Sequence, residues 1–568
     1  MANGLDLRYW QSRRITRRRM LGGVAAGGAA AGAIALVGCS SSKKSTNGTT
    51  PGAQSSNNKP QDGTQDGPGK PGGILRVRQG GALPSMNPFG PSIFALAQGL
   101  TLGFTVFDHM WYVPTDTGVR ENFLATKVEQ PDPLTVIATL GDAVFHDKPP
   151  VNGRPVLPSD VEASFKRFRD ESGIGYDWIH NVMDDIKGDD AAKTVTIKQK
   201  MPWAWVFTSS NAGSPITSSI LPKEILHNND LLNKDAIGSG HWTLASHENG
   251  ANIKFRKFAN YRRKGYPLLD GVDFKLITDD SAGLAAFKAG EIDTYGFTNK
   301  SESEDTAASM GAKIVTGSDL ARDYVCLMLR YEAPFTDERI RHAFNLLIDR
   351  DDALKLLSEG AAIKAGPIPP AHKKYALPES DPDLQNYFKH DIAEAKKLLD
   401  AAGFDYDQSH DLKHSVRPVD AQLAQVLQAQ FKAGGVKINL VPEDLVKWFS
   451  QSLGQGNFHM TCFLHLPYED PDLPLRFYLA SSGDFKNFMG YSDDKVNQAV
   501  LAAAQELDEQ ARIKKVQDAQ KVIINAWAPM LNLYSDVNYG ARYAYVKGSI
   551  TGRGSLGAFN TTTWLDKS

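Results

Sequence analysis

The sequence predicts an α/β protein of several domains, preceded by an export segment and a linker. Three observations indicate this organisation. β-like runs alternate with helix-like periods from Gly73 to near the end of the chain. The 568 residues, 41% of them hydrophobic, supply enough apolar side chains for more than one core. The stretch from Ser40 to Gly73 is rich in Ser, Asn, Gly and Pro, has almost no large apolar side chain, and separates the body from the N-terminus.

The first forty residues have the pattern of a secretory signal peptide, predicted over residues 1–38. A basic start with five arginines between positions 13 and 19 is followed by the uncharged stretch Met20–Val37. A membrane-spanning anchor is the alternative, because this stretch is about long enough to span. Its Gly and Ala residues supply little apolar area, however, so a signal peptide is favoured.

Two motifs refine this prediction. Thr16–Leu21, with Arg17 and Arg18, resembles a twin-arginine export signal, and Leu36-Val37-Gly38-Cys39 resembles a lipobox. Cys39 would then be lipidated and become the first residue of the mature chain. Residues 39–71 would form a flexible tether with a span of roughly 30 Å. We therefore expect an extracytoplasmic protein attached to the membrane by its N-terminal lipid.

Charge and cysteine content narrow the class of protein further. The formal net charge is −2, which gives no indication of nucleic-acid binding. Besides Cys39 the chain has only Cys326 and Cys462, so one disulfide is arithmetically possible, although buried thiols are commoner.

Local patterns in the body predict strands and capped helices. Ile74–Arg78, Leu134–Leu140 and Thr194–Lys198 have the apolar or alternating character of strands. Ser159 with Glu162, and Asp391 with Glu394, have the spacing of a capping box at the start of a helix. Further helices are predicted after Thr336-Asp337 and after the N-capping pair Asp279-Asp280, and Gly403 is predicted to end the helix that begins at Asp391.

Motifs for covalent or metal chemistry are scarce. The sequence has no GxSxG, HExxH or P-loop pattern, so we expect neither an enzyme nor a cofactor. Gly552–Gly557 fits GxGxxG but lies too close to the C-terminus for a βαβ unit, and is interpreted as a glycine-rich loop. His410 and His414 could be metal ligands on a helix, but their polar surroundings favour a solvated pair in a loop.

Several segments resemble, in the same order, landmarks of the binding proteins of ABC importers for oligopeptides, dipeptides and nickel. The similarity covers residues 72–568. It is carried by Gly72–Val77, Phe145-His146-Asp147, Ser159–Phe165, Ile237–Trp242, Gly290–Asp293, Pro334–Ala343 and Asp391–Leu399. The resemblance implies a two-lobed, Venus-flytrap fold of the large class with an extra inserted domain. Lobe one would comprise residues 72–105, 211–320 and 536–568, the extra domain 106–210, and lobe two 321–535.

The resemblance also implies ligand-binding residues in lobe two. Arg417 in the Arg417-Pro418 pair occupies the position of an arginine that holds a peptide carboxylate, with a surface salt bridge as the alternative. Family members hold a peptide amine with an aspartate where this chain has Pro467, so Glu469 or Asp470 would have to substitute. This difference leaves room for a sugar, a metal chelate or a modified peptide.

Aromatic and polar side chains complete the predicted ligand site. Rigid rings can stack on sugars or apolar groups, and Trp448 is singled out because it precedes the ligand segment of lobe two. Tyr324, Trp242 and Asn87 are the other predicted ligand residues, and core packing is the alternative for each ring.

These observations predict a monomeric, lipid-anchored receptor that closes on a small solute, peptide-like or otherwise, and delivers it to an ABC permease in the membrane. An exported, tethered hydrolase and a sensory receptor on the same fold remain alternatives. Carboxylates and histidines converging in the cleft would favour the hydrolase.

Overall fold

The computed structural model describes most of the body of the chain. The described residues are 69–81, 83, 85–89, 102–103, 105–112, 120–171, 178–208, 212, 218–248, 250–321, 323–464, 470–479, 486–548 and 561–567. Contacts divide the chain after Asn57, and all of these residues belong to the unit that follows. The predicted signal peptide, with Arg17 and Arg18, and the predicted lipidation site Cys39 lie outside the described residues, as do Pro467, Glu469 and the Gly552–Gly557 loop.

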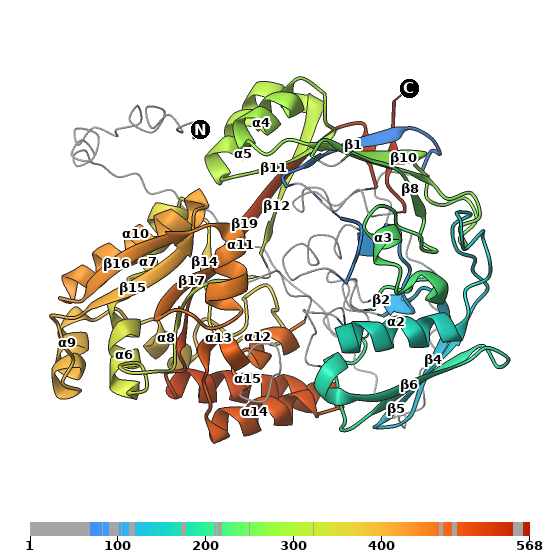
Figure 1. Cartoon of the computed structure of the whole chain (residues 1–568). Helices are drawn as coiled ribbons and strands as arrows, with labels where there is room; N and C mark the ends of the chain where they lie inside the picture. Colours follow the sequence, from blue (N-terminus) through green and yellow to red (C-terminus); the bar gives the residue numbers. More distant parts are fainter. Residues whose placement is uncertain are drawn as a thin grey trace, which may run out of the picture. The chain divides into compact units, whose positions relative to one another are not determined.

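A seven-stranded sheet forms the first part of the body (Figure 1). Its strands in spatial order are β12 (Ile314–Leu320), β19 (Val537–Tyr543), β11 (Thr294–Phe297), β1 (Ile74–Gln79), β10 (Gly271–Leu276), β9 (Asn252–Lys257) and β8 (Trp242–Glu248). The helices α4 (Asp280–Lys288) and α5 (Lys300–Met310) flank β11 in the chain. β1 confirms the predicted opening strand, and its alternating Leu75 and Val77 are buried while Ile74 is exposed.

A six-stranded sheet forms the second part, drawn in yellow to orange in Figure 1. Its strands in spatial order are β14 (Ile363–Lys364), β18 (Met530–Ser535), β13 (Val325–Leu329), β17 (Met460–Leu464), β15 (Ser409–Ser415) and β16 (Lys437–Glu443). Its helices are α6 (Glu338–Leu347), α7 (Arg350–Leu357), α8 (Pro382–Tyr387), α9 (Ile392–Ala401), α10 (Pro418–Ala433), α11 (Leu445–Lys447), α12 (Asp472–Arg476), α13 (Lys486–Met489), α14 (Asp494–Ala504) and α15 (Glu509–Asn525).

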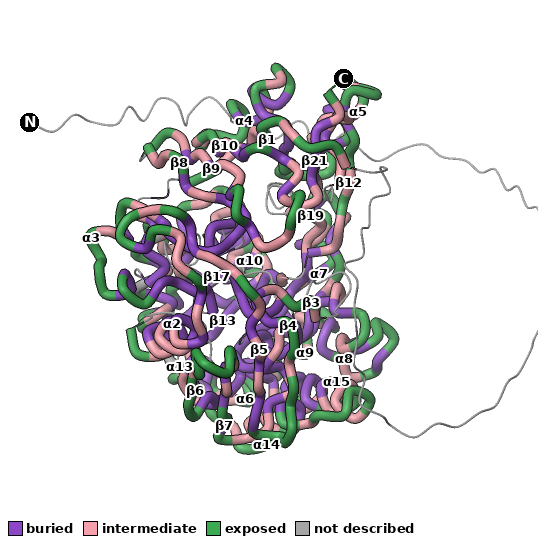
Figure 2. The backbone as a smooth tube through the Cα atoms, turned by 90° about the vertical axis from the view of Figure 1, so that its right-hand side faces the viewer, coloured by how far each residue is buried: buried purple, intermediate pink, exposed green. Residues whose placement is uncertain are grey.

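The central strand β13 shows why this sheet is covered on both faces. Its sequence Val-Cys-Leu-Met-Leu is apolar throughout and every residue is buried (Figure 2). Cys326 and Met328 join one hydrophobic cluster, whereas Leu327 and Leu329 join another. A strand buried on both sides needs apolar residues at successive positions, which is the pattern observed.

A smaller, antiparallel sheet lies between β1 and β8 in the sequence. Its strands in spatial order are β4 (Ala125–Asp132), β5 (Thr135–Leu140), β7 (Thr194–Gln199) and β6 (Met183–Asp189), with α2 (Pro158–Glu171) contacting β6. The strands predicted at 134–140 and 194–198 are thereby confirmed. Short elements complete the body: β2 (Trp111–Tyr112), β3 (Glu121–Asn122), α3 (Asn229–Leu232), β20 (Val546–Lys547) and β21 (Trp564–Leu565).

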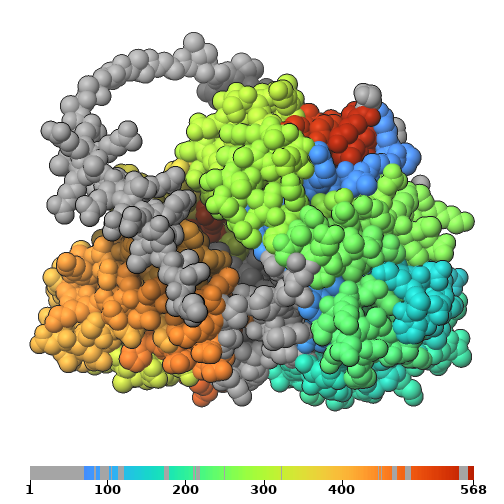
Figure 3. All heavy atoms as spheres, turned by 45° about the horizontal axis from the view of Figure 1, so that its top comes forward, coloured from blue at the N-terminus to red at the C-terminus, as the bar shows by residue number. Residues whose placement is uncertain are grey.

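Both ends of the described chain meet at the seven-stranded sheet. Lys70 forms an ion pair with Asp566 at 2.5 Å, and the Leu268 N–H donates to the carbonyl of Thr561. Figure 3 shows the C-terminal residues in red against the first strand in blue.

The chain crosses between the seven-stranded and six-stranded sheets twice, at one place. β12 ends at Leu320 and β13 begins at Val325, while β18 ends at Ser535 and β19 begins at Val537. The N–H of Ala321 donates to the carbonyl of Asp536 at 2.8 Å, so the two crossing segments are paired. We call Ala321, Asp323, Tyr324 and Asp536 the crossover. The chain passes from one sheet to the other near the predicted lobe boundaries at residues 320–321 and 535–536. The complete set of domain boundaries remains a prediction.

Helix capping follows the local sequence at most predicted positions. Asp391 accepts from the N–H of Glu394, Asp337 caps α6 and Asp279 caps α4, as predicted. Gly403 adopts the predicted left-handed conformation (φ +67°) after α9. The capping box at Ser159 is wrong, because that residue lies inside α2 and its hydroxyl donates to Asp190 at 2.8 Å.

Candidate ligand-binding site

The parallel strands of both sheets end on the side where the chain crosses over. β15 runs parallel to β16 and β17, and the last residue of β17, Leu464, pairs with the first residue of β13, Val325. In the other sheet β1 runs parallel to β10 and β11, and β11 and β12 both end opposite the start of β19. Ligands of open α/β sheets bind outside the carboxyl ends of the strands. The loops after these strands are therefore the candidate site.

Arg417 lies directly after β15 at this edge and begins α10. Its Nε and Nη2 donate to the carboxylate of Asp420 at 2.9 and 3.1 Å, and the hydroxyl of Ser415 also binds that carboxylate. The Arg417 side chain remains 38% exposed, while Asp420 is buried. Val416 and Val419 beside it are exposed by 59% and 44%. The guanidinium is thus fixed by Asp420 and remains partly accessible to solvent.

Asp470 follows the end of β17 along the chain. It is only 4% exposed, and its Oδ1 accepts from the N–H of Asp472 at 3.0 Å. Its Oδ2 has no hydrogen-bond partner among the described residues. A buried carboxylate oxygen without a donor is costly, so it marks a place where a cationic or hydrogen-bonding group would be favoured.

Trp448 follows β16, but its ring does not reach an open surface. The side chain is 2% exposed, packs near Phe463 and Phe449, and donates from Nε1 to Thr461 Oγ1 at 2.9 Å. This geometry is that of a core residue supporting the candidate site from behind. Its predicted contact with a ligand stays a prediction.

Tyr324 and Trp242 are also fully buried. Tyr324 lies in the crossover, where its hydroxyl contacts the sulfur of Met530 at 3.6 Å. Trp242 begins β8 and its ring is tilted against His241 at 5.4 Å. The two rings belong to the hydrophobic cluster that spans much of the body.

Asn87 is held by its own loop and by α3. Its Oδ1 accepts from the N–H of Phe89 at 3.0 Å, and its Nδ2 donates to Asn229 at 3.3 Å. The side chain is buried, so these bonds position the loop after β1. Whether it also binds the solute stays a prediction.

A polar cluster at the ends of β15 and β16 was not predicted from the sequence. The Lys413 ammonium donates to Ser452 at 3.2 Å and lies 3.6 Å from Glu443, which also pairs with Lys447 at 3.3 Å. Burial opposes ionisation of Glu443, but the Ser452 hydroxyl and the two lysines together hold its pKa below the usual value. Lys413 lies 30 positions before Glu443 and 39 positions before Ser452, so no short sequence motif reveals the cluster.

The two histidines considered as metal ligands are core residues. His410 and His414 lie on β15, not in a loop, and both are buried, so the prediction of a solvated pair is wrong. Two-residue alternation along the strand places them on one face with Leu412. Burial lowers the pKa of His410, whose ring is stacked on Phe404. Among the described residues no group of His, Cys, Asp and Glu is arranged to hold a metal ion.

Cys326 and Cys462 are not joined in a disulfide. Cys462 pairs with Leu327 across the sheet, one position from Cys326, so the two thiols point to opposite faces. They belong to different hydrophobic clusters. Burial raises the pKa of both thiols, in agreement with inert core residues.

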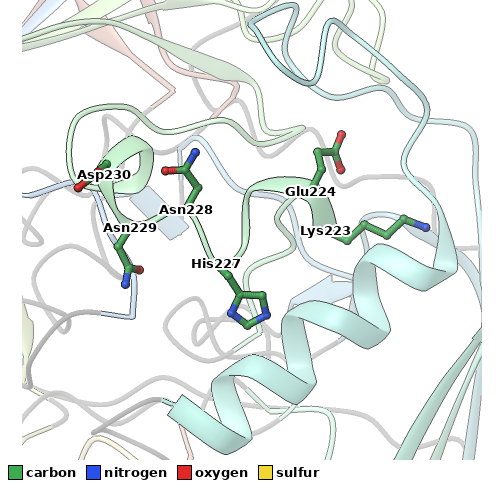
Figure 4. A pocket seen from close by; sticks show the side chains of 6 residues that line it. All are labelled: Lys223, Glu224, His227, Asn228, Asn229 and Asp230. Carbon is green, nitrogen blue, oxygen red and sulfur yellow. The ribbon is translucent and has the colours of Figure 1, made fainter.

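Two of the surface pockets formed by the described residues can be compared with the candidate site. One, of about 500 Å³, is lined by Lys223, Glu224, His227, Asn228, Asn229 and Asp230, whose side chains point in different directions instead of converging (Figure 4). Glu224 is already paired with Arg154, and His227 lies 3.2 Å from Glu171. Another, of about 540 Å³, lies over α7, α9 and α10. Neither contains a predicted ligand residue.

Within the described ranges, no helix combines the length and apolar character that a membrane span requires.

Comparison with known proteins identifies the relatives of the chain. Residues 121–487 match the family described as bacterial extracellular solute-binding proteins, family 5 middle. The dipeptide-binding protein DppE of Bacillus subtilis is 24% identical over 451 residues, which cover 73% of this chain and 79% of DppE.

Solved structures show the same fold. DppA from Helicobacter pylori, a periplasmic binding protein in complex with the peptide STSA, has a TM-score of 0.72 at 23% identity and covers 88% of this chain and 99% of its own. AgaA from A. tumefaciens R10, in complex with agropinic acid, has a TM-score of 0.73 at 20% identity, with 88% and 99% covered. The fold is therefore that of a two-lobed periplasmic binding protein.

Proposed function

Because the chain belongs to the bacterial extracellular solute-binding proteins of family 5, we propose that its solute is peptide-like and carries a carboxylate, bound at the carboxyl edge of the six-stranded sheet. Members of this family are receptors that deliver a solute to an ABC importer and are not enzymes, which settles the general role of this chain. The proposal concerns the ligand and the residues that hold it.

Arg417 carries the proposal. Asp420 orients its guanidinium, and its Nη1 has no hydrogen bond within the described residues. A planar guanidinium held in this way can bind a carboxylate with little further loss of side-chain entropy. The exposed Val416 and Val419 would contact an apolar group next to that carboxylate. The C-terminal residue of a peptide presents this combination when its side chain is apolar, because its carboxylate and side chain lie next to each other.

Asp470 would hold the other end of the solute. Its buried Oδ2 lacks a partner and would accept from an ammonium group. Family members hold the amine with an aspartate at the position that Pro467 occupies in this chain. Proline cannot accept this bond, so Asp470 takes over the role. Glu469 remains a second predicted carboxylate in the same segment.

The relatives support a solute that carries carboxylates. By their names they bind dipeptides, a peptide, agropinic acid or glutathione. A metal chelate remains compatible, since one neighbour is in complex with Ni(L-His)2. A sugar without a charged group is disfavoured, because it would not use the charge of the oriented Arg417 guanidinium.

The N-terminal motifs support a location of this receptor at the outer face of the membrane. We propose export through the twin-arginine signal with Arg17 and Arg18, cleavage before Cys39, and lipidation of that cysteine. The tether 39–71 would then hold a monomeric body within reach of its ABC permease. The extra domain is proposed as 106–210, with lobe one and lobe two as predicted.

The ligand proposal is tested by native mass spectrometry of the full-length protein, extracted in detergent and never refolded. We expect a mass excess that disappears on denaturation and belongs to a compound with a carboxylate. Arg417→Ala should lose this excess. Arg339→Ala is the matched control, because Arg339 is paired with Asp337 near the start of α6, away from the strand ends. A retained compound without a carboxylate, or equal retention by Arg417→Ala, overturns the proposal.

The anchor is tested on the same preparation. Intact mass should show a mature chain that begins at Cys39 and carries acyl chains, and Cys39→Ser should abolish the modification and release the protein from the membrane fraction. A chain that keeps its first 38 residues would contradict the proposed processing.

A further inference from the structure

A short segment of the extra domain contacts lobe two far from the crossover. The segment Met201–Val206 follows β7, and three of its residues touch lobe two. The N–H of Ala204 donates to the carbonyl of Ala504, the last residue of α14, at 2.8 Å. Trp203 donates from Nε1 to Asp472 Oδ2 at 3.3 Å. Trp205 lies edge-on to Tyr375, with ring centroids 5.4 Å apart.

Two cations strengthen this contact, and one of them, Arg476, is completely buried. The Arg476 guanidinium lies 5.8 Å from the centre of the Trp203 ring and pairs with Asp472 at 2.9 Å. The Arg512 guanidinium lies 4.9 Å from the Trp205 ring. Both tryptophans are almost fully buried, although the segment is irregular and no strand of the small sheet pairs with lobe two. Specific polar and cation–π contacts therefore connect two bodies that the covalent chain joins only at the crossover.

Two hydrogen bonds connect this contact with the candidate ligand site. Asp472, which accepts from Trp203, donates its own N–H to Asp470 Oδ1 at 3.0 Å. Asp470 is the buried carboxylate with an oxygen left over for the solute. The indole of Trp203, in the proposed extra domain, is therefore two hydrogen bonds away from the proposed solute contact in lobe two.

We infer that Met201–Val206 is a latch that holds the two lobes closed on the side away from the crossover, with Trp203 as the residue that positions Asp472 and Asp470. Hinge closure brings a small number of discrete contacts together and separates them again on opening. A latch of this kind couples closure to the ligand site. Asp472, which accepts from Trp203, lies only two positions from Asp470, the carboxylate proposed to contact the solute. The inference rests on the receptor role but not on the chemistry of the solute.

Distance measurement between spin labels tests the latch without a ligand assay. Gln130→Cys on β4 and Gln498→Cys on α14 place labels at exposed positions on the two bodies, while Cys326 and Cys462 are buried and do not react. The wild-type protein should show a population at the short, latched distance. Trp203→Ala should reduce the ratio of latched to open molecules by about tenfold or more, and Trp203→Phe, which keeps the ring but not the donor, by a smaller factor.

Trp178→Phe is the matched control. Trp178 is equally buried and donates from Nε1 to Gln199 at 2.9 Å, but wholly within the extra domain. It should keep the wild-type distances. Hydrogen exchange gives an independent readout, since the Ala204 amide should lose protection in Trp203→Ala and keep it in Trp178→Phe. A wild-type protein without the short distance, or a Trp203→Ala variant that keeps it together with a protected Ala204 amide, overturns the latch. Neither outcome bears on whether the solute carries a carboxylate.

Discussion

The crossover and the latch join the same two bodies by different means. At the crossover two covalent segments run side by side, and the Ala321–Asp536 bond is made by backbone atoms. At the latch one backbone bond, from the Ala204 N–H to the Ala504 carbonyl, is accompanied by contacts that depend on the side chains of Trp203, Asp472 and Arg512. Backbone pairing persists through most substitutions, whereas an indole donor or a guanidinium is lost with one.

The two regions also differ in charge. The crossover gathers carboxylates: burial and the charges of Asp536 and Asp319 raise the pKa of Asp323 to about 7. The latch pairs its carboxylate, because Asp472 faces Arg476. The latch neutralises the charge that it buries, whereas the crossover brings carboxyls close together and thereby raises the pKa of one of them. The predictions below test this difference.

Asp472→Ala should have the largest effect on stability. It leaves Arg476, which is completely buried, without its counter-ion, and such a change costs about 3–5 kcal/mol in the free energy of unfolding. Chemical denaturation followed by tryptophan fluorescence measures the loss. Asp170→Ala is the control, since its pair with Arg169 is exposed and should contribute about 0.5 kcal/mol or less. A loss for Asp472→Ala no larger than that of the control would show that the latch carries no buried charge.

Asp323→Asn should change the pH dependence of stability. The carboxyl has a pKa near 3.8 when unfolded and about 7 when folded, so the folded state holds a proton that the unfolded state releases between these values. The contribution of Asp323 to stability is therefore present at low pH, falls as pH rises from about 4 to 7, and stays lost above. At pH 8 the asparagine variant should be more stable than the wild type by about 4 kcal/mol.

Thermal unfolding at pH 5, 6, 7 and 8 measures this difference. Asp142→Asn serves as the control, because Asp142 is paired with Lys193 and its pKa is lowered, not raised. A constant difference between wild type and Asp323→Asn across this range would contradict the assigned charge state of the crossover.

Glu359→Ala should have a small effect. Its carboxylate accepts from both the N–H and the hydroxyl of Ser301, at 2.9 and 2.8 Å, and so caps the start of α5 from the opposite lobe. Removing a cap at an exposed helix end costs about 0.5–1 kcal/mol. The spin-label distances used for the latch should change far less than with Trp203→Ala. An equal shift would make this contact, and not the latch, the main closing element.

Reducing agent should have no effect at all. Cys326 and Cys462 face opposite sides of the six-stranded sheet near the crossover, so no cross-link contributes there. The Tm should agree within about 1 °C with and without a reductant, whereas a disulfide would contribute about 2–4 kcal/mol. A clear loss of Tm on reduction would show that the crossover depends on more than backbone pairing.

Sequence reasoning succeeded where the information is local. Asp391 and Gly403 mark the two ends of α9 because capping depends on residues within a few positions of each other. It failed at Ser159, where a tertiary partner, Asp190, competes for the hydroxyl. It failed also at His410 and His414, whose polar neighbours suggested a loop although a central strand buries both rings.

The sequence by itself determined the family of this protein, several of its strands and capped helices, and Arg417 as the residue to examine. It could not determine which predicted side chains face a ligand. Trp448 carries a suitable ring but is buried, and Arg417 is oriented by Asp420 in a geometry that spacing alone does not fix. The latch could not be predicted from the sequence either, because Trp203 and Asp472 are 269 positions apart. Only the packing of one sheet-containing body against another brings such residues together, because no local periodicity encodes that contact.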